Sequence, residues 1–153
     1  MIYKATKLIK QEMDKQGLKY SIEEFDNSSV VFAGFWIEKG ANIRVQFVSQ
    51  DNDNDVAIRL YGLVNNVGTD KLDKVLRVIN ECNMNYRYVK FVLDKDRDIN
   101  IEYDIPMKAS DTSVGAEACE MFIRIMKIAD ECYPKIMSAL WSWFVFCYVL
   151  GEN

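Results

Sequence analysis

The sequence predicts a single α+β domain in which an antiparallel sheet carries its helices on one face. Amphipathic stretches with a helical period alternate with short runs in which apolar and polar residues alternate, as they do in half-buried strands. The links between consecutive strand-like runs are short, which favours antiparallel neighbours because a parallel crossover needs about a dozen residues or more. A chain of 153 residues without a linker or an internal repeat is expected to form one domain over residues 1–153.

The expected order of elements begins with a helix over residues 2–16, followed by a meander of four strands. Gly17 is a plausible end for this helix because glycine enters the left-handed C-terminal cap without strain. Lysines occupy the polar side of the helix, and we read them as a solvated face. The four strands are expected at residues 20–25, 30–37, 43–47 and 56–61.

A second helix is expected from Gly68-Thr69-Asp70, with Thr69 or Asp70 as its N-cap, to residues 83–85. A hairpin of two strands follows, at residues 89–93 and 99–105, joined by a charged loop. A third helix is expected after the cap region 110–113.

Pro134 is expected to end or kink the third helix, because proline lacks the backbone donor and clashes with the preceding turn. It could equally occupy the first turn of a fourth helix. Residues 135–150 form an apolar C-terminal segment that is uncharged from Ile136 onward, and both helix and strand remain open for it.

Composition and motifs exclude several classes of function. The chain has no histidine, which removes Ser-His-Asp triads, Cys-His dyads and HExxH zinc sites. Its net charge of −4 argues against nucleic-acid binding, which needs a basic surface. The run Asp51–Asp55 lacks the glycine and glutamate of a calcium loop, and no glycine-rich phosphate loop exists. We therefore expect no catalytic residues, no metal ligands and no cofactor.

The four cysteines, Cys82, Cys119, Cys132 and Cys147, do not have zinc-binding or thioredoxin-type spacing. Each lies in an apolar stretch, so we expect buried, reduced thiols. The N-terminus lacks the continuous apolar core of a signal peptide, and no window reaches the ~20 apolar residues of a membrane span. These observations predict a cytoplasmic protein.

Two apolar features are larger than one simple core requires. In the strand over residues 30–37, Phe32 and Trp36 should lie on one face and Phe35 and Ile37 on the other, so both faces should need a cover. The segment from Trp141 to Leu150 has no polar side either. This tail could pack on the second sheet face, or it could form a homodimer or partner interface in which aromatic anchors dominate binding. The candidate partner-binding residues are Phe35, Trp36, Trp141, Trp143, Phe144 and Phe146.

Three short motifs carry a resemblance to a known family. They are Leu76-Arg77-Val78-Ile79-Asn80, Val89-Lys90-Phe91-Val92-Leu93-Asp94 and Ala129-Asp130-Glu131-Cys132-Tyr133-Pro134. Together with the order of elements, they resemble the YbjN-like family, whose members are proposed to regulate bacterial sensory transduction and are similar in fold to type III secretion chaperones. The resemblance is strongest over residues 69–141, and the aromatic tail beyond Leu140 departs from it.

The resemblance implies a small acidic protein that binds other proteins and supplies no catalytic residues to carry over. Secretion chaperones of this fold are typically dimers that hold extended segments of a client. The resulting hypothesis is a non-enzymatic cytoplasmic protein-binding module, chaperone-like or regulatory, that forms a homodimer. The alternatives are an enzyme of an unrecognised class that uses carboxylate, Lys, Tyr or Cys chemistry, and a peripheral membrane protein anchored by the tail. A membrane is the less favoured partner because few cations flank the tail.

Overall fold

The structure is a computed structural model that describes residues 1–38, 40, 42–50 and 54–142. Its helices are α1 (Lys4–Gln16), the short 3₁₀ turn η1 (Thr69–Lys71), α2 (Leu72–Asn85) and α3 (Val114–Trp141). Its strands are β1 (Tyr20–Phe25), β2 (Ser28–Trp36), β3 (Asn42–Gln50), β4 (Asp55–Val64), β5 (Lys90–Leu93) and β6 (Ile99–Pro106). The predicted α+β class and the predicted order of elements are confirmed.

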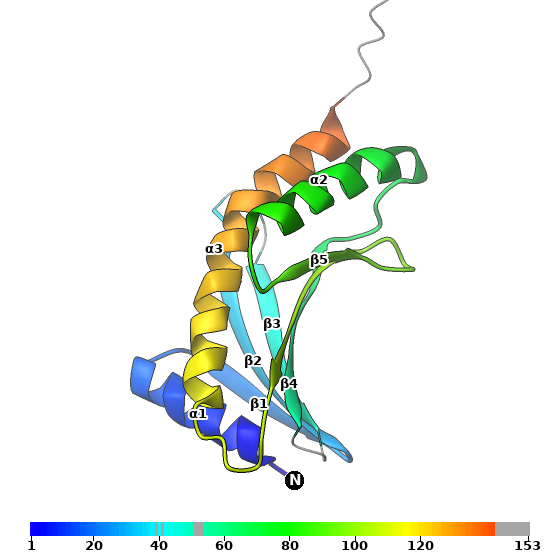
Figure 1. Cartoon of the computed structure of the whole chain (residues 1–153). Helices are drawn as coiled ribbons and strands as arrows, with labels where there is room; N and C mark the ends of the chain where they lie inside the picture. Colours follow the sequence, from blue (N-terminus) through cyan, green and yellow to red (C-terminus); the bar gives the residue numbers. More distant parts are fainter. Residues whose placement is uncertain (39, 41, 51–53, 143–153) are drawn as a thin grey trace, which may run out of the picture.

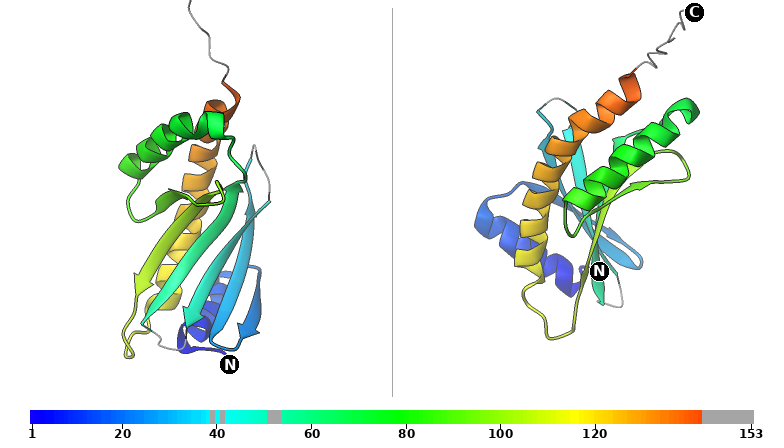
Figure 2. Two further views of the ribbon diagram at one scale, coloured as in Figure 1. Left: turned by 90° about the vertical axis from the view of Figure 1, so that its right-hand side faces the viewer. Right: turned by 45° about the horizontal axis from the view of Figure 1, so that its top comes forward.

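The strands form one six-stranded sheet with the order β1-β2-β3-β4-β6-β5, and every neighbouring pair is antiparallel. Helices α1 and α3 lie against one face of this sheet, and α2 packs beside α3 at the end of the sheet that β5 forms (Figures 1 and 2). Among the described residues, no helix lies on the opposite face. The sheet is therefore a meander of four strands extended by a hairpin, as the short connections predicted.

The core lies between the sheet and α3, and its centre is aromatic. Phe122 of α3 meets Phe35 edge-on, with ring centroids 5.9 Å apart, and Phe47 at 6.1 Å. Such edge-on pairs add stabilisation to the area that they bury. The stripe predicted for the third helix is almost entirely buried, with Ile125, Ala129 and Cys132 fully enclosed.

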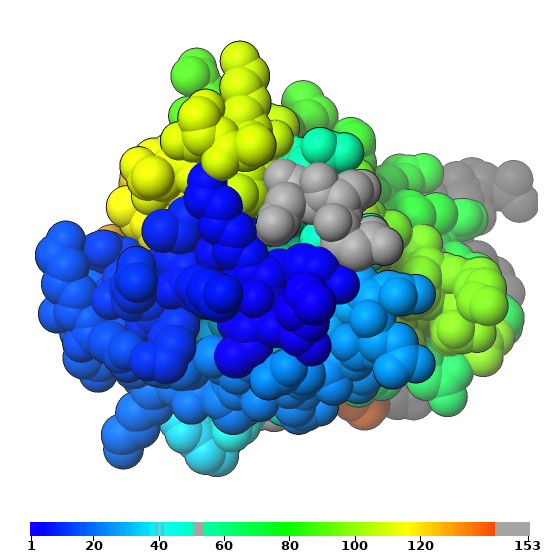
Figure 3. Space-filling model, turned by 90° about the horizontal axis from the view of Figure 1, so that it is seen from below, coloured from blue at the N-terminus to red at the C-terminus, as the bar shows by residue number. Residues whose placement is uncertain are grey.

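A buried hydroxyl cluster fixes α1 on the sheet. The Thr6 hydroxyl lies 2.7 Å from that of Ser29 on β2 and donates to that of Ser49 on β3 at 2.9 Å, and all three residues are fully buried. Buried polar groups are tolerated when they bond to one another, so this cluster sets the position of α1 over β2 and β3. Seen from below, the first residues lie beside the β6–α3 connection, where Lys4 donates to the carbonyl of Ala109 (Figure 3).

Of the residues predicted to begin or end the helices, some have the expected role and others do not. Gly17 ends α1 in the left-handed conformation, with φ at 69°, as expected. Thr69 and Asp70 do not cap α2, because η1 intervenes and α2 begins at Leu72 without a side-chain cap. Ser113 occupies the N-cap position of α3, but its hydroxyl binds the carboxylates of Asp111 and Glu117 instead of a backbone N–H.

The expectation that Pro134 ends the third helix is wrong. Helix α3 runs through Pro134 to Trp141, and no separate fourth helix begins there. Buried residues continue the apolar stripe beyond the proline, at Ile136 and Ala139, so packing keeps the chain helical despite the missing donor. The part of α3 that contains Pro134 is tilted relative to the N-terminal part, which agrees with the expected alternative of a kink (Figure 1). The predictions for residues 143–150 and for the 51–53 loop lie outside the described residues.

Cys82, Cys119 and Cys132 are free and buried, as expected, and Cys147 lies outside the described residues. Burial raises the pKa of the Cys119 thiol to about 11. Among the described residues, no helix combines the length and the apolarity that crossing a membrane would require.

Candidate partner-binding surface

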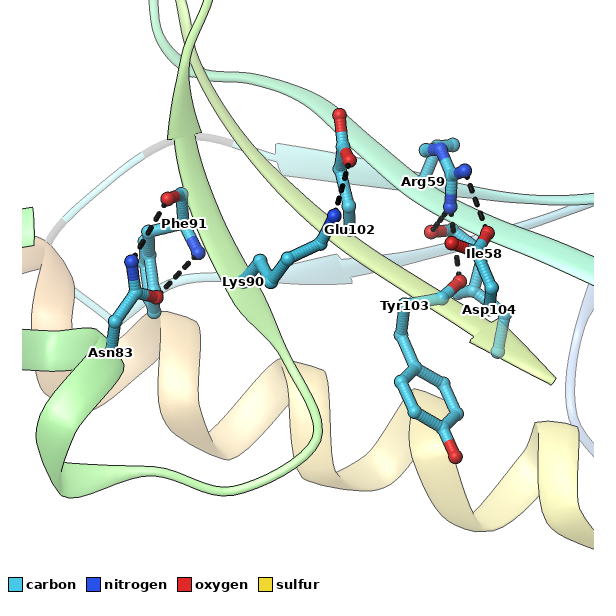
Figure 4. A network of polar contacts seen from close by, with 8 residues as sticks. All are labelled: Ile58, Arg59, Asn83, Lys90, Phe91, Glu102, Tyr103 and Asp104. Atoms are coloured by element: carbon cyan, nitrogen blue, oxygen red, sulfur yellow. Dashed lines mark hydrogen bonds and ion pairs between the residues drawn. The ribbon is translucent and has the colours of Figure 1, made fainter.

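The face of the sheet that points away from the helices is polar across most of its width. The register places Glu23, Arg44, Arg59, Glu102 and Asp104 on this open face, together with Lys90 of the edge strand. They pair across strands. Arg44 pairs with Glu23 at 3.0 Å. Arg59 pairs with Asp104 at 2.6 Å, and Lys90 pairs with Glu102 at 3.4 Å (Figure 4). The open face can therefore meet water without a second layer of protein.

The apolar residue Phe32 on this open face is covered by the chain itself. The Arg44 guanidinium lies 3.6 Å from the centre of the Phe32 ring, and Phe32 is only 8% exposed. Glu23 holds the guanidinium in place. Phe32 is therefore covered, as expected of an apolar residue, and the cover is a long charged side chain of the neighbouring strand.

Three aromatic side chains of the open face lack such a cover, and Trp36 is the most exposed of them. It lies at the end of β2 opposite Asn42 and is 75% exposed. Tyr61 of β4 and Phe25 of β1 are about half exposed; Tyr61 belongs to this face because it follows the buried Leu60, and Phe25 because it pairs with Ser28. A tryptophan held out from a paired strand offers a large contact area at little cost in conformational freedom.

Phe35, the neighbour of Trp36 in the predicted set, lies on the other face. It is 7% exposed and packs against Phe122 in the core. Because successive side chains of a strand point to opposite faces, Phe35 and Trp36 cannot belong to one surface. Phe35 therefore leaves the candidate surface, and its role is in the core.

Trp141 lies in a different place, at the end of α3, and is 74% exposed. It borders an open groove of about 370 Å³ that is also lined by Val64, Val67, Met137 and Leu140. The structure thus places Trp36 and Trp141 on separate elements, a strand and a helix, and does not bring them together. Trp143, Phe144 and Phe146 lie outside the described residues.

The two edges of the sheet differ. At the β5 edge, the Asn83 side chain accepts from the Phe91 N–H at 2.7 Å and donates to the Phe91 carbonyl at 3.1 Å (Figure 4). This one side chain thus occupies the backbone groups that an added strand would use. At the other edge, β1 pairs only with β2 among the described strands.

Sequence reasoning missed the two side chains that complete this surface. Arg44 and Asn83 look like ordinary polar positions in the sequence, because nothing local shows that one covers Phe32 and the other caps β5. Within the described part of the chain, no group of three or more Cys, Asp or Glu side chains gathers to hold a metal ion.

The comparisons with known proteins agree on one family. The model of the YbjN family, described as "Putative bacterial sensory transduction regulator", matches residues 7–136. The crystal structure of YbjN from E. coli, described as "a putative transcription regulator", shares 13% identity with a TM-score of 0.55, over 84% of this chain and 91% of that chain. At this identity the likeness shows the fold alone. No curated protein matches the chain significantly.

Proposed function

This chain belongs to the YbjN family, and on that premise we propose that it is a non-enzymatic regulator that binds a protein partner through Trp36. The proposal includes a cytoplasmic location. The observation that carries it is the 75% exposure of a tryptophan on a sheet face whose charged side chains pair with one another. Tryptophan is among the residues most enriched at the energetic centres of interfaces, and it is uncommon to leave one so exposed on a rigid strand.

The surroundings of Trp36 are suited to recognition. The ion pair between Arg44 and Glu23 supplies charged groups on the same face, with Arg44 two residues along β3 from Asn42, the partner of Trp36. Charged groups beside an aromatic anchor are the usual arrangement of a polar rim beside an apolar centre. The uncapped β1 edge borders the same face and can accept an extended segment by main-chain hydrogen bonds. A chaperone-like mode, in which an extended segment of a client lies along β1, follows from these two features.

The test compares capture by the full chain with capture by Trp36→Ala from an extract of the source organism. We expect the variant to recover at least about tenfold less of the specific partner, because removal of a central tryptophan costs about 2 kcal/mol or more. The matched control is Leu76→Ala, which removes another exposed apolar side chain from α2. Circular dichroism checks that both variants fold. Equal recovery by wild type and Trp36→Ala would remove this surface from the proposal.

We also propose that the free protein is a homodimer joined through Trp141 and the uncharged residues 142–151 that follow it. Light scattering on the full chain should give twice the 17.8 kDa mass of one chain. Trp141→Ser should shift the equilibrium toward the monomer, while Trp36→Ala should leave it unchanged. A wild-type protein that stays monomeric at high concentration would contradict the dimer without bearing on the Trp36 surface.

A further inference from the structure

Tyr88 has an unusual backbone conformation in the connection between α2 and β5. Its φ is 76°, and the Val89 N–H donates to the Arg87 carbonyl at 3.0 Å, which closes a three-residue γ-turn around it. This conformation is strained for a residue with a bulky side chain, and such strain gathers at functional sites. The strain therefore indicates that the position of the Tyr88 side chain has a role.

The turn directs the Tyr88 ring toward α3, where it meets two partners. Its ring lies edge-on to that of Tyr103 at 6.2 Å, and the Arg124 guanidinium is 5.4 Å from its centre. Tyr103 reaches this position because its side chain points from β6 toward α3 (Figure 4). Tyr88 is nevertheless 58% exposed, so burial does not account for the strain.

Two cavities of opposite character meet at Tyr88 and Arg124, which line both. The smaller, of about 170 Å³, is lined by the Tyr88 and Tyr103 rings and by Glu117 and Glu120. The larger, of about 510 Å³, has Arg87 and Lys127 among its lining residues and no carboxylate. The first suits a cation, which binds to aromatic faces and carboxylates, and the second suits an anion.

The charged groups of the two cavities are only partly satisfied within the chain. Arg124 donates to Glu120 at 3.0 and 2.5 Å, and this pairing raises the pKa of Arg124. Glu117 accepts a hydrogen bond from the Ser113 hydroxyl, which leaves its negative charge uncompensated. Arg87 and Lys127 form no ion pair with any residue that the structure describes. One negative and two positive groups therefore remain for a ligand.

We propose that the joined cavities bind a small zwitterion of the ω-amino-acid type, whose ammonium and carboxylate groups are separated by a short carbon chain. Its ammonium group lies between Glu117 and the rings of Tyr88 and Tyr103, and its carboxylate lies between Arg87 and Lys127. Arg124 separates the two charges, and Glu120 neutralises it. The site is on the helix side of the sheet, so it is independent of the Trp36 surface.

The test uses 6-aminohexanoate on the full chain, with hexylamine and hexanoate as its two halves. We expect calorimetry to show that 6-aminohexanoate binds at least about tenfold more tightly than either half, because one molecule then makes both interactions at a single cost of association. Failure of all three compounds to bind at millimolar concentration would overturn the proposal. It would also be overturned if a half bound as tightly as the whole.

Two substitutions test which charged end of the ligand occupies which cavity. Glu117→Gln should weaken hexylamine and 6-aminohexanoate and leave hexanoate unchanged, whereas Lys127→Gln should weaken hexanoate and 6-aminohexanoate and leave hexylamine unchanged. Lys19→Gln, between α1 and β1, makes the same charge change as Lys127→Gln and should alter none of the three. Uniform effects of the two cavity variants on all three compounds would show general electrostatics and would contradict the assigned orientation.

Discussion

Phe35 and Trp36 are adjacent aromatic residues of one strand, yet one is 7% exposed and the other 75%. Phe35 meets Phe122 of α3, because the helices cover its face of the sheet. On the open face, a charged side chain of the neighbouring strand, Arg44, covers Phe32. The comparison teaches that a strand with two apolar faces does not need two protein layers. It also shows where the cover ends, which is before Trp36.

The largest expected difference in the free energy of unfolding is between alanine variants of these two neighbours. Phe35→Ala should lower the free energy of unfolding by about 3–5 kcal/mol, because it leaves a cavity beside Phe122. Trp36→Ala should change it by no more than about 0.5 kcal/mol, since an exposed side chain contributes little to the fold. Urea unfolding followed by circular dichroism measures both. Similar losses for the two variants would mean that the open face around Trp36 is covered in solution.

The next largest effect is expected at the buried hydroxyl cluster that positions α1 on the helix-covered face of the sheet. Thr6→Val keeps the shape of the side chain but leaves the hydroxyls of Ser29 and Ser49 without their common partner, so we expect a loss of about 1–3 kcal/mol in the free energy of unfolding. Thr69→Val, at an exposed position of η1, is the matched control and should be nearly neutral. If the two variants behave alike in thermal unfolding, the cluster does not hold α1 in place.

A smaller effect extends the comparison from the faces of the sheet to its edges. Asn83→Ala should lower the free energy of unfolding by about 1 kcal/mol, because it removes both hydrogen bonds to Phe91. It should also make sedimentation depend on concentration, since an uncapped edge can pair with another chain. Asn85→Ala, two residues along α2, should do neither. Sedimentation that is identical for the two variants would show that Asn83 does not protect the edge.

The smallest effect concerns the cover of Phe32. Arg44→Ala should lower the free energy of unfolding by about 0.5–1 kcal/mol, because it removes the stacked guanidinium and exposes the ring. Arg44→Gln keeps much of the stem and should cost less. Loss of stability in Arg44→Gln equal to that in Arg44→Ala would assign the effect to the ion pair with Glu23 instead of the stacking.

The fold could be predicted well because its signals are local. The alternation in β3 and β4, the apolar stripe of α3 and the glycine at position 17 each reflect the backbone geometry of their own segment. The prediction that the helix ends at Pro134 was wrong, because it used only the local effect of proline on the backbone. Residues on both sides of the proline are buried. Ile136 and Ala139 extend the buried stripe, and tertiary packing then outweighs the missing hydrogen bond.

The site was less predictable because its properties depend on contacts between distant segments. Trp36 was identified from its apolar strand, but Phe35 was wrongly grouped with it because the sequence does not show which face the helices cover. The cavities beside Tyr88 bring together residues of β6, α3 and the α2–β5 connection. No spacing in the sequence indicates that Tyr88, Tyr103 and Arg124 meet, and the positive φ of Tyr88 has no signal in its residue type.

The hydrogen bonds from Asn83 to β5 make the two edges of the sheet unequal. A sheet with two open ends can add copies without limit, as fibres do, because every addition leaves another free end. Here Asn83 occupies the N–H and C=O groups of Phe91 at the β5 edge, whereas β1 pairs only with β2 among the described strands. Strand pairing between copies is therefore favoured at β1, and two copies that met there around a two-fold axis would have their β5 edges outermost. Asn83 would then oppose further growth of such a pair at those edges.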